Sequence, residues 1–317
     1  MARLSDVLVV NAGSTSLKLS VVDAAERSTQ VASLDDVPPV MAVAHRIVHG
    51  GERFVEPTLV DDSVANGLRG LVELAPLQMQ PALDALARAR DLLPKLDHVA
   101  VFDTEFHRTL PERAWTYALP ERWRALGIRR FGFHGLSVAW AAEQVQVPRL
   151  VVCHLGGGCS VTAVLAGRSV DTTMGFTPLD GVPMGTRPGS VDPGVLLHLL
   201  RHGVAIDELT SGLEHESGLR GLAGTSDVAE LLASAEPASR LALEVFTYRV
   251  AQAVAAMATA LGGIDAIAFT GGIGEHAEAV RESIVDRLRL LGDFDVCVVA
   301  AQEDVVAARA ARVVTSR

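Results

Sequence analysis

Three glycine-rich turns carry the clearest chemical signal in this sequence. Each turn follows an apolar, strand-like run, and the runs begin at Val7, Leu150 and Ile264. Glycines let successive backbone N–H groups converge on an anion, and turn hydroxyls such as those of Ser16 and Ser160 add uncharged donors. A single glycine hairpin is ordinarily only a turn, but three of them in one chain predict phosphate-binding turns and an internally duplicated fold.

A second group of chemically capable side chains lies near the ends of predicted elements. Arg46, Asp103 and His154 follow or end apolar runs, while His134 and Arg187 lie on loops. Open α/β sheets bind their ligands beyond the carboxyl ends of the strands, so we expect the strand-end residues along one cleft. Each of these residues alone is ordinarily a solvated charge or a turn residue, and only the combination predicts a site.

The elements that must position these residues alternate between strands and helices, which predicts an α/β fold. A helical pattern extends over residues 63–93, a junction between two halves is expected near Pro148, and a long helix is expected over residues 237–261. That long helix is apolar on too many faces to lie on a surface, and Gly262 is placed to cap it. We expect it in a domain core or a dimer core.

Composition limits the class of protein. At 317 residues with 49% hydrophobic side chains, the chain is long enough for two domains with separate cores. It has 28 basic and 38 acidic residues, a net charge of −10, and no block rich in Lys and Arg, which argues against a nucleic-acid partner. Cys153, Cys159 and Cys297 have no paired spacing and are expected as free thiols.

The sequence also predicts a cytoplasmic protein without a membrane partner. The N-terminus enters a strand directly, which leaves no room for an export signal. The most apolar stretch, residues 250–269, is interrupted by Gln252, Gly262 and Asp265. We therefore expect a buried helix followed by a strand rather than a membrane span.

Seven motifs occur in order along the chain: NAGSTSLK, HRIVHGG, FDTEFH, GFHG, HLGGGCS, GTRPG and FTGGIGE. Together they resemble the acetate kinase family of short-chain carboxylate kinases, in the actin, sugar kinase and heat-shock chaperone superfamily. The resemblance implies two actin-like α/β domains with a duplicated β-hairpin phosphate-binding core and an active-site cleft between the domains. It implies a first domain of residues 1–148 plus 303–317, and a second domain of residues 149–302 that holds the nucleotide site and forms a homodimer.

The resemblance further implies a reversible, Mg²⁺-dependent, in-line transfer of the ATP γ-phosphoryl group to acetate or propionate, giving an acyl phosphate. The residues present fit that chemistry. A carboxyl group has a pKa of about 4, so the acceptor is ionised at neutral pH and needs no base, unlike a sugar hydroxyl. Two arginines suit a carboxylate and a phosphoryl group, because a planar guanidinium binds either one by paired hydrogen bonds.

The resemblance assigns roles residue by residue. Arg46 and Arg187 are implied to hold the substrate carboxylate and the moving phosphoryl group, and His134 to donate to the transferring oxygens. Asp103 and Glu303 are implied to organise Mg²⁺ and the reactive centre. The implied metal ligands are Glu303 and Asn11. The positions implied around ATP are Asn11, Ser14, Ser16, Lys18, His154, Gly156, Gly157, Gly158, Asp227, Gly271, Gly272 and Gly274. The apolar pocket implied for the acid is formed by Val48, Leu77, Phe133 and Pro178.

Departures from the family pattern fall mostly on the nucleotide side. Gly157, Ala229 and His276 stand where an asparagine, an arginine and an asparagine are expected. The lost hydrogen bonds predict weak ATP binding and tolerance of other donors, pyrophosphate among them. The open alternatives are a kinase for a larger acid such as butyrate, a phosphatase of the same superfamily, and a non-catalytic homologue that binds a nucleotide or an acyl phosphate.

Overall fold

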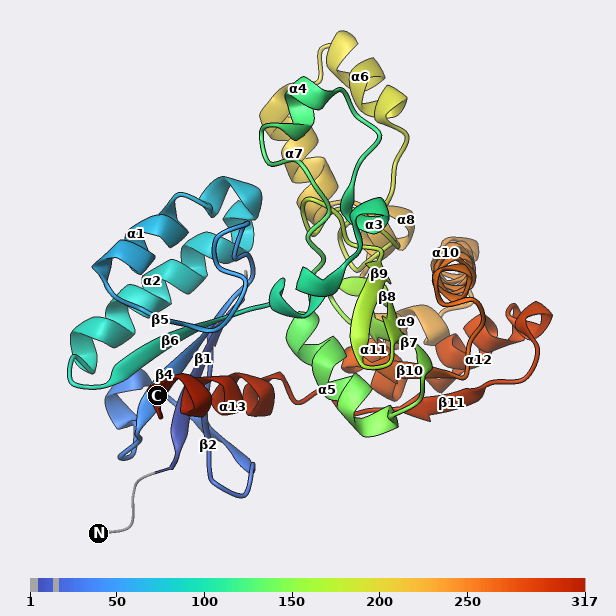
Figure 1. The fold of residues 1–317 in the computed structure, drawn as a ribbon. Coiled ribbons are helices and arrows are strands. Elements are labelled where there is room, and N and C mark those ends of the chain that lie inside the picture. The colour runs from blue at the N-terminus through green and yellow to red at the C-terminus, as the bar shows by residue number, and fades with distance from the viewer. Residues whose placement is uncertain (1–4, 14–16, 317) are drawn as a thin grey trace. The chain divides into compact units, whose positions relative to one another are not determined.

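The computed structural model describes residues 5–13 and 17–316, and it contains two compact units (Figure 1). The first unit comprises Met1–Arg108, Phe133–Trp140 and Gln302–Arg317, and the second comprises Thr109–Gly132 and Ala141–Ala301. Each unit is built on one β-sheet with helices packed against it.

This division differs from the expected boundary at residue 148. Residues 109–132 belong to the second unit because they are tied to its edge strand. The Thr109 hydroxyl donates to the Ser169 carbonyl at 2.8 Å, and Arg130 Nη1 donates to the Thr172 carbonyl at 3.0 Å. Both hydrogen bonds join segments far apart in the sequence, and no local sequence pattern predicts them.

The sheet of the first unit has six strands. They are β1 (Val7–Ala12), β2 (Leu17–Val22), β3 (Ser28–Val31), β4 (Ala42–Ile47), β5 (Thr58–Leu59) and β6 (Asp97–Phe102), in the order β3-β2-β1-β4-β6-β5. β1 and β2 form the antiparallel hairpin that the sequence predicts, while β1, β4 and β6 run parallel. The carboxyl ends of these three strands bring Asn11, Arg46 and Asp103 to the same end of the sheet.

Both faces of this sheet are covered, so its strands are nearly continuous apolar runs. Alternate residues of β1 pack in two separate cores. Leu8 packs with α1 (Asp62–Arg69) and α2 (Pro76–Leu92), whereas Val9 packs with α13 (Glu303–Thr315). Figure 1 shows α1 and α2 on one side of the sheet and α13, in red, on the other.

The C-terminal helix α13 is tied to β2. Asp304 accepts a hydrogen bond from the Ser20 hydroxyl at 2.6 Å, and Arg312 Nη2 donates to the carbonyls of Val22 and Asp23 at 2.8 Å each. Because α13 begins at Glu303, these ties also fix the position of the Glu303 carboxylate.

The sheet of the second unit repeats the plan of the first. Its strands are β7 (Arg149–Leu155), β8 (Cys159–Leu165), β9 (Arg168–Thr172), β10 (Ala266–Thr270) and β11 (Asp295–Val298), in the order β11-β10-β7-β8-β9. β7, β8 and β9 form an antiparallel meander, and β10 and β11 continue the sheet in parallel with β7. The same arrangement joins β1, β2, β3, β4 and β6, so the predicted duplication of an α/β fold is confirmed.

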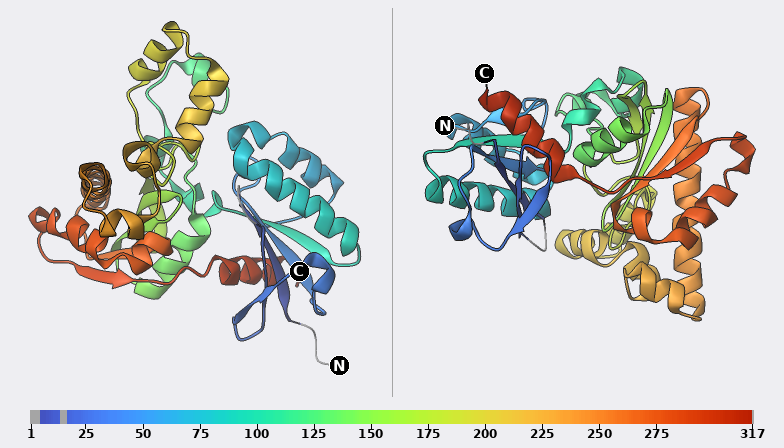
Figure 2. Two further views of the ribbon diagram at one scale, coloured as in Figure 1. Left: turned by 180° about the vertical axis from the view of Figure 1, so that it is seen from behind. Right: turned by 90° about the horizontal axis from the view of Figure 1, so that it is seen from below.

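The remaining helices lie in the second unit, except that the helix beginning at Gly135 has its residues up to Trp140 in the first unit. They are α3 (Glu112–Trp115), α4 (Glu121–Arg124), α5 (Gly135–Val145), α6 (Pro193–Arg201), α7 (Ile206–His215), α8 (Gly218–Ala223), α9 (Val228–Ala233), α10 (Pro237–Leu261), α11 (Gly271–His276) and α12 (Glu278–Asp286). Short 3₁₀ helices occur at Leu34–Asp36, Val72–Leu74, Glu105–Thr109 and Arg289–Leu291. α10 packs against β8, and Figure 2 shows it beside the strands of its own unit.

Helix α10 has the extent and the cap that the sequence predicts. It ends at Gly262, which has a positive φ of 69° and forms the left-handed cap. By length and composition it is the one helix among the described residues that meets the criteria for a membrane span. The side chains of Phe246, Val250 and Val254 are nevertheless fully buried within the fold, as expected of a core helix.

Candidate functional site

Arg46 is the centre of a charged cluster in the first unit. Its guanidinium donates to both oxygens of Asp103, from Nε at 2.9 Å and from Nη2 at 2.7 Å. Nη1 lies 2.9 Å from Glu303 Oε2 and donates to Asn11 Oδ1 at 3.2 Å. Four residues that the sequence singles out therefore meet, and each comes from the end of a strand or the start of α13.

The Arg46 cluster is electrically compensated. Burial alone would lower the pKa of Arg46, but the Asp103 carboxylate, followed by Glu303, outweighs burial and raises that pKa above its usual range. A guanidinium has five N–H donors, and the contacts with Asp103, Glu303 and Asn11 use four of them. Arg46 is therefore rigidly held and keeps one donor for a ligand.

His134 occupies a strained loop position close to Asp103. Its φ is +60°, a left-handed conformation that costs energy in any residue except glycine. The next residue, Gly135, donates its N–H to the Asp103 carbonyl at 2.8 Å, and a Cβ at Gly135 would overlap that oxygen. Since only glycine fits there, the GFHG motif fixes His134 relative to Asp103.

Two buried histidines that the sequence analysis did not select support Phe133. His107 Nε2 lies 2.9 Å from the Phe133 carbonyl, and the His49 ring packs edge-on against the Phe133 ring with centroids 5.4 Å apart. Both histidines belong to motifs, FDTEFH and HRIVHGG, which were the available signal. Of the other residues predicted for the apolar pocket, Val48 packs against the core under α2, and Leu77 is half-buried on α2.

In the second unit the two later glycine turns lie against each other. Gly156 donates its N–H to the Gly158 carbonyl at 3.0 Å within the turn between β7 and β8. A Cβ at Gly271 would lie 2.8 Å from the Leu155 carbonyl, and a Cβ at Gly156 would lie 3.8 Å from the Gly272 nitrogen. Backbone therefore packs on backbone here, and only residues without side chains allow the approach at Gly271.

The ends of β7 and β10 place further polar groups beside these turns. His154 and Thr270 are paired across the two strands. Thr270 is fully buried, and its hydroxyl has no hydrogen-bond partner among the residues described. Glu275 Oε1 accepts from the Gly271 N–H at 3.1 Å, and Gly274 is buried within the same short helix. The sequence analysis missed Thr270 and Glu275, although both stand within or beside the FTGGIGE motif.

Arg187 contrasts with Arg46. Its side chain is half-buried, and Nη1 donates to the Pro178 carbonyl at 2.7 Å. Burial lowers the pKa of Arg187, but the guanidinium stays charged at neutral pH. No ion pair of Arg187 occurs in the described part of the chain. A half-buried cation that forms no ion pair in the described chain, and that a carboxylate, Glu214, stabilises only from beyond ion-pair distance, is typical of an anion-binding site.

Two other predicted residues, Asp227 and Lys18, form no side-chain hydrogen bond or ion pair with these clusters in the described chain. Asp227 Oδ1 caps α9 by accepting from two of its first N–H groups, at 2.8 Å and 3.2 Å. Lys18 is exposed on β2. Ser14 and Ser16 lie outside the described residues.

All three cysteines are free thiols, as the sequence predicts. Burial raises the pKa of Cys159 to about 12, so its thiol is neutral. Cys159 Sγ donates to the Gly156 carbonyl at 3.3 Å, which makes it a small side chain that supports the glycine turn.

The donors around Arg46 suit a hard divalent cation that a nucleotide carries. In the described residues, no group of three or more His, Cys, Asp or Glu side chains could enclose a metal ion. Mg²⁺ prefers oxygen ligands, keeps several waters and is ordinarily held by one or two carboxylates together with phosphates. Arg46 binds one carboxylate oxygen of Glu303. The other Glu303 oxygen and the side-chain oxygen Oδ1 of Asn11 suit a Mg²⁺ ion that takes its remaining ligands from water and phosphate.

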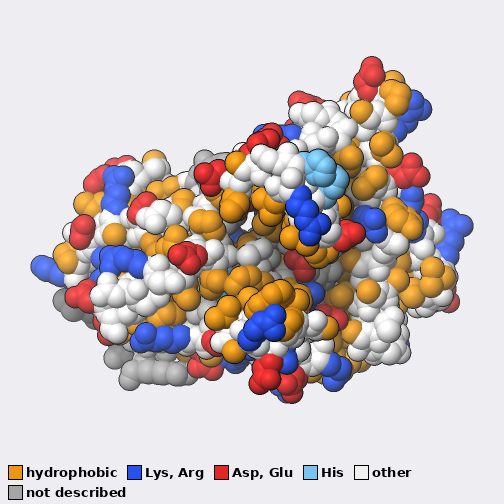
Figure 3. Space-filling model, turned by 90° about the horizontal axis from the view of Figure 1, so that it is seen from above, with side chains coloured by type: hydrophobic (Ala, Val, Ile, Leu, Met, Phe, Trp, Pro, Cys, Tyr) orange, Lys and Arg blue, Asp and Glu red, His pale blue; other side chains and the backbone are white. Residues whose placement is uncertain are grey.

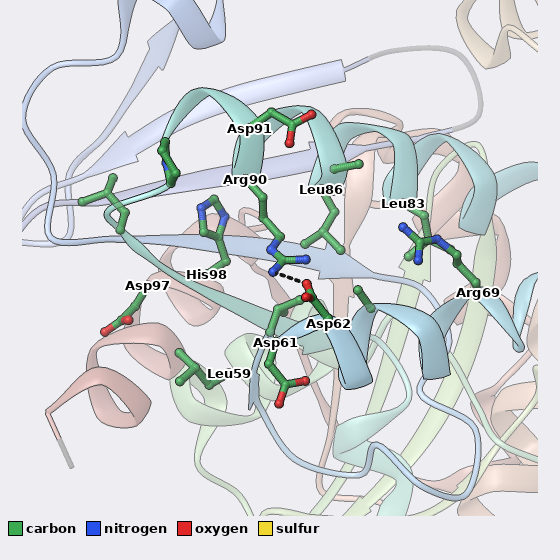
Figure 4. Close-up of a pocket in the computed structure, with 15 residues that line it drawn as sticks. Leu59, Asp61, Asp62, Arg69, Leu83, Leu86, Arg90, Asp91, Asp97 and His98 are labelled. Atoms are coloured by element: carbon green, nitrogen blue, oxygen red, sulfur yellow. Dashed lines mark hydrogen bonds and ion pairs between the residues drawn. The ribbon is translucent and has the colours of Figure 1, made fainter.

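A cavity of about 590 Å³ in the first unit is lined by a different set of residues (Figure 4). It lies among β5, α1, α2 and the start of β6, and Arg90 reaches Asp62 within it at 2.9 Å. None of its lining residues is one that the sequence analysis selected. It is therefore separate from the Arg46 cluster.

Comparisons with known proteins identify the family. The sequence matches the model of the acetokinase family over residues 29–315. The acetate kinase of Deinococcus radiodurans is 50% identical over 267 residues, covering 80% of this chain and 67% of that protein. The acetate kinase of Protochlamydia amoebophila is 42% identical over 289 residues, covering 88% and 73%. Among solved structures, a propionate kinase from Francisella tularensis has a TM-score of 0.90 at 30% identity, covering 97% of this chain and 99% of that one. Porphyromonas gingivalis acetate kinase has a TM-score of 0.85 at 27% identity, covering 98% and 99%.

The duplicated fold and the similarity to solved carboxylate kinases show a phosphotransferase of the actin-like superfamily. Within that class, the chain belongs to the acetokinase family, and it is a kinase whose acceptor is a carboxylate. The family, the fold class and the enzyme class predicted from the sequence are confirmed.

Next to Arg46, on the opposite face of β4, His45 forms a buried pair with His98. His45 Nε2 lies 2.9 Å from His98 Nδ1, and His98 Nε2 lies 3.2 Å from the Leu93 carbonyl. Because a carbonyl only accepts, His98 donates from Nε2, and His45 therefore donates from its own Nε2. His45 Nδ1 is then unprotonated, and it has no partner in the described residues. Burial, and next the nearby His98, hold the pKa of His45 well below its usual 6.5.

We predict that the free energy of unfolding falls as the pH drops below about 6.5, because the unfolded chain then binds a proton that folded His45 excludes. One excluded proton gives a slope of up to about 1.4 kcal/mol per pH unit. Urea unfolding at about pH 7.5 and about pH 5.5 measures the loss. His45→Gln keeps a donor toward His98 and should reduce it, whereas the control His202→Gln, at an exposed position, should leave it unchanged. The same loss in both variants would contradict the assignment.

Proposed function

We propose that this protein reversibly transfers the γ-phosphoryl group of Mg²⁺–ATP to acetate or propionate, giving an acyl phosphate. The observation that carries the proposal is the unequal treatment of two arginines. Arg46 is neutralised by Asp103 and Glu303, whereas Arg187 has only a carbonyl partner in the described chain. The relatives' names, acetate kinase and propionate kinase, support these two acids.

The acceptor carboxylate would be bound by arginine. Arg46 keeps one N–H donor after its protein contacts, and Arg187 keeps four of its five. A carboxylic acid with a pKa of about 4 is already ionised at neutral pH, so it attacks phosphorus without a general base. The residues therefore need to orient two anions and to offset their repulsion, which is what guanidinium groups do.

Arg187 and His134 would stabilise the phosphoryl group in transit. Direct in-line transfer passes through a loose state whose negative charge lies on three equatorial oxygens. The four remaining donors of Arg187 and an imidazole N–H of His134 suit those oxygens. The backbone of the second and third glycine turns and the buried Thr270 hydroxyl suit the other phosphates. No covalent enzyme intermediate is required.

Mg²⁺ would arrive with the nucleotide. Bound there, it would supply positive charge that offsets the negative charge of the phosphates. Glu303 and Asn11 would hold it through the oxygen chemistry described above. Asp103 has both oxygens on Arg46, so its role would be to orient that arginine rather than to bind the metal.

The choice of acid would be set by the small apolar residues beside the arginines. One methylene in such a pocket changes the free energy of binding by about 1–3 kcal/mol. Acetate and propionate are the acids that the relatives' names support, and butyrate is the larger alternative.

We also propose a cytoplasmic homodimer assembled through the second unit. α6 has no buried residue and exposes Val195 and Leu197, and α10 exposes Leu241 and Tyr248. Exposed apolar surface of this kind is characteristic of obligate dimers.

On the face in Figure 3, hydrophobic side chains gather between interspersed acidic and basic ones. This mixture, with a net charge of −10, supports small-molecule partners rather than nucleic acid.

The test of the proposed reaction is hydroxylamine trapping of the acyl phosphate, with ATP, Mg²⁺ and each of acetate, propionate and butyrate. The wild-type protein should form the acyl hydroxamate. Arg187→Ala should lower kcat by about 10²–10³-fold, the effect of removing a donor to developing charge. Arg287→Ala, which removes an exposed arginine whose side chain bonds only to Ser283 in the described chain, is the matched control and should leave kcat unchanged. Absence of product with every acid would instead support a non-catalytic binding protein.

The residues at positions 157 and 229 in the second unit favour the use of phosphoryl donors other than ATP. Ala229 stands where an arginine is expected, and it is exposed on α9 behind the capping residue Asp227. At Gly157 a Cβ would meet open space. We therefore propose that ATP binds weakly and that pyrophosphate also serves as a donor.

Ala229→Arg should lower the KM for ATP by about tenfold, the value of one charge-assisted hydrogen bond, and should leave the KM for pyrophosphate unchanged. Steady-state kinetics with both donors measures the change. Ala233→Arg, which adds the same charge at another exposed position of α9, is the control. A wild-type enzyme that saturates at low micromolar ATP and rejects pyrophosphate would refute the proposal.

A further inference from the structure

The position of Arg187 depends on a long irregular segment. Residues 173–192 connect β9 to α6 without a helix or strand of their own, and they contain both Arg187 and Pro178. The carbonyl of Pro178 is the group that receives the Arg187 guanidinium, at 2.7 Å. A segment of this length without regular hydrogen bonding keeps one conformation only where specific side chains hold it. Whatever holds this segment therefore also holds Arg187.

Arg130 holds the beginning of the segment. Its Nη1 donates to three consecutive carbonyls, those of Thr172 at 3.0 Å, Thr173 at 2.7 Å and Met174 at 3.1 Å. A charged donor bound to three carbonyls fixes the direction in which the chain leaves β9. Arg130 itself comes from the RRFGFHG motif, four residues before His134.

Asp180 closes the segment around Arg187. Its Oδ1 accepts from the Gly181 N–H at 2.8 Å and from the Ser190 hydroxyl at 2.7 Å, while Oδ2 lies 3.6 Å from Arg130 Nη1. The Ser190 N–H also donates to the Gly181 carbonyl at 2.8 Å. The stretch from Gly181 to Ser190 is thus closed into a loop that contains Arg187. The Asp180 carboxylate lies where the two ends of this loop meet.

Tyr117 holds the middle of the segment against Asp180. The Tyr117 hydroxyl accepts from the Phe176 N–H at 2.9 Å. A Cβ at Gly175 would overlap the Tyr117 hydroxyl and lie 2.6 Å from Asp180 Oδ2. Glycine is required where these two side chains close on the backbone, only three residues before Pro178.

We propose that Asp180, supported by Arg130 and Tyr117, is a positioning residue for phosphoryl transfer. It acts by closing the loop that presents Arg187, and its own carboxylate is engaged with the loop instead of the guanidinium. The inference rests on the proposed role of Arg187 in holding the transferring group. Interactions that stabilise transferring charge depend steeply on placement, so loosening the loop should reduce kcat more than it changes the KM for the donor.

The experiment compares Asp180→Ala with Asp171→Ala, using the trapping assay with ATP and acetate. Both carboxylates line the same cavity of about 380 Å³, but among the described residues Asp171 accepts only from the neighbouring Thr172 N–H. Asp180→Ala should lower kcat about 10- to 100-fold with the KM for ATP changed less than about threefold. Asp171→Ala should change kcat by less than about threefold. Asp180→Asn, which keeps an oxygen for Gly181 and Ser190, should fall between wild type and Asp180→Ala.

The double variant with Arg187→Ala separates positioning from general loss of structure. If Asp180 acts through Arg187, Asp180→Ala should have little further effect on kcat in the Arg187→Ala background. The same reduction in both backgrounds, or unchanged kcat in Asp180→Ala, would overturn the inference. Normal kcat in Arg187→Ala alone would instead overturn the proposed function. Should Asp180→Ala not fold by circular dichroism, Ser190→Ala carries the test, with an expected reduction in kcat of about threefold to tenfold that is likewise absent beside Arg187→Ala.

Discussion

Removing a guanidinium from water is costly unless an opposite charge or a full set of acceptors replaces the water. This protein meets that constraint in two different ways. Arg46 is surrounded by Asp103, Glu303 and Asn11, which leave it almost fully bonded. Arg187 is offered the Pro178 carbonyl, a dipole rather than a charge. The first arrangement is stable by itself, whereas in the proposed function the second is completed by an anion that the reaction supplies.

The fold makes both arrangements available by repeating one plan. In each unit an antiparallel hairpin continues into parallel strands, so strand ends and turns gather at one end of a sheet. In the first unit that end carries charged side chains. In the second unit it carries glycine turns, where backbone approaches backbone and where we propose that N–H groups bind phosphates. A single architecture thus supports side-chain recognition in one unit and backbone recognition in the other.

The features of the structure that depend on local sequence patterns could be predicted from the sequence. The apolar runs and glycine turns predicted the hairpins, and Gly262 predicted the end of α10. The strand-end positions of Arg46 and Asp103 predicted that both lie along one cleft, but not that they bond to each other directly. Asp227 caps α9, which an equally local rule could have predicted. The family resemblance instead implied a nucleotide-binding role for this residue.

The parts that could not be predicted depend on contacts between distant or irregular segments. Residues 109–132 join the second unit through Thr109 and Arg130, which bond to strand β9 some forty to sixty residues later. The His45–His98 pair spans two strands, and nothing in either sequence neighbourhood indicates it. The closure by Asp180 lies in a loop with no periodicity, where no repeating pattern of residues records the conformation.

The central claim is that Arg187 is kept as an uncompensated cation for a ligand, and its most direct test is stability without any ligand. Urea unfolding of Arg187→Met and Arg46→Met should give changes of opposite sign. Arg187→Met should raise the free energy of unfolding by about 0.5–2 kcal/mol, as expected where function is maintained at the expense of stability. Arg46→Met should lower it by about 3–5 kcal/mol, because it leaves Asp103 and Glu303 without their partner. If Arg187→Met were instead less stable than the wild type, Arg187 would be a satisfied structural residue, and the account would be contradicted.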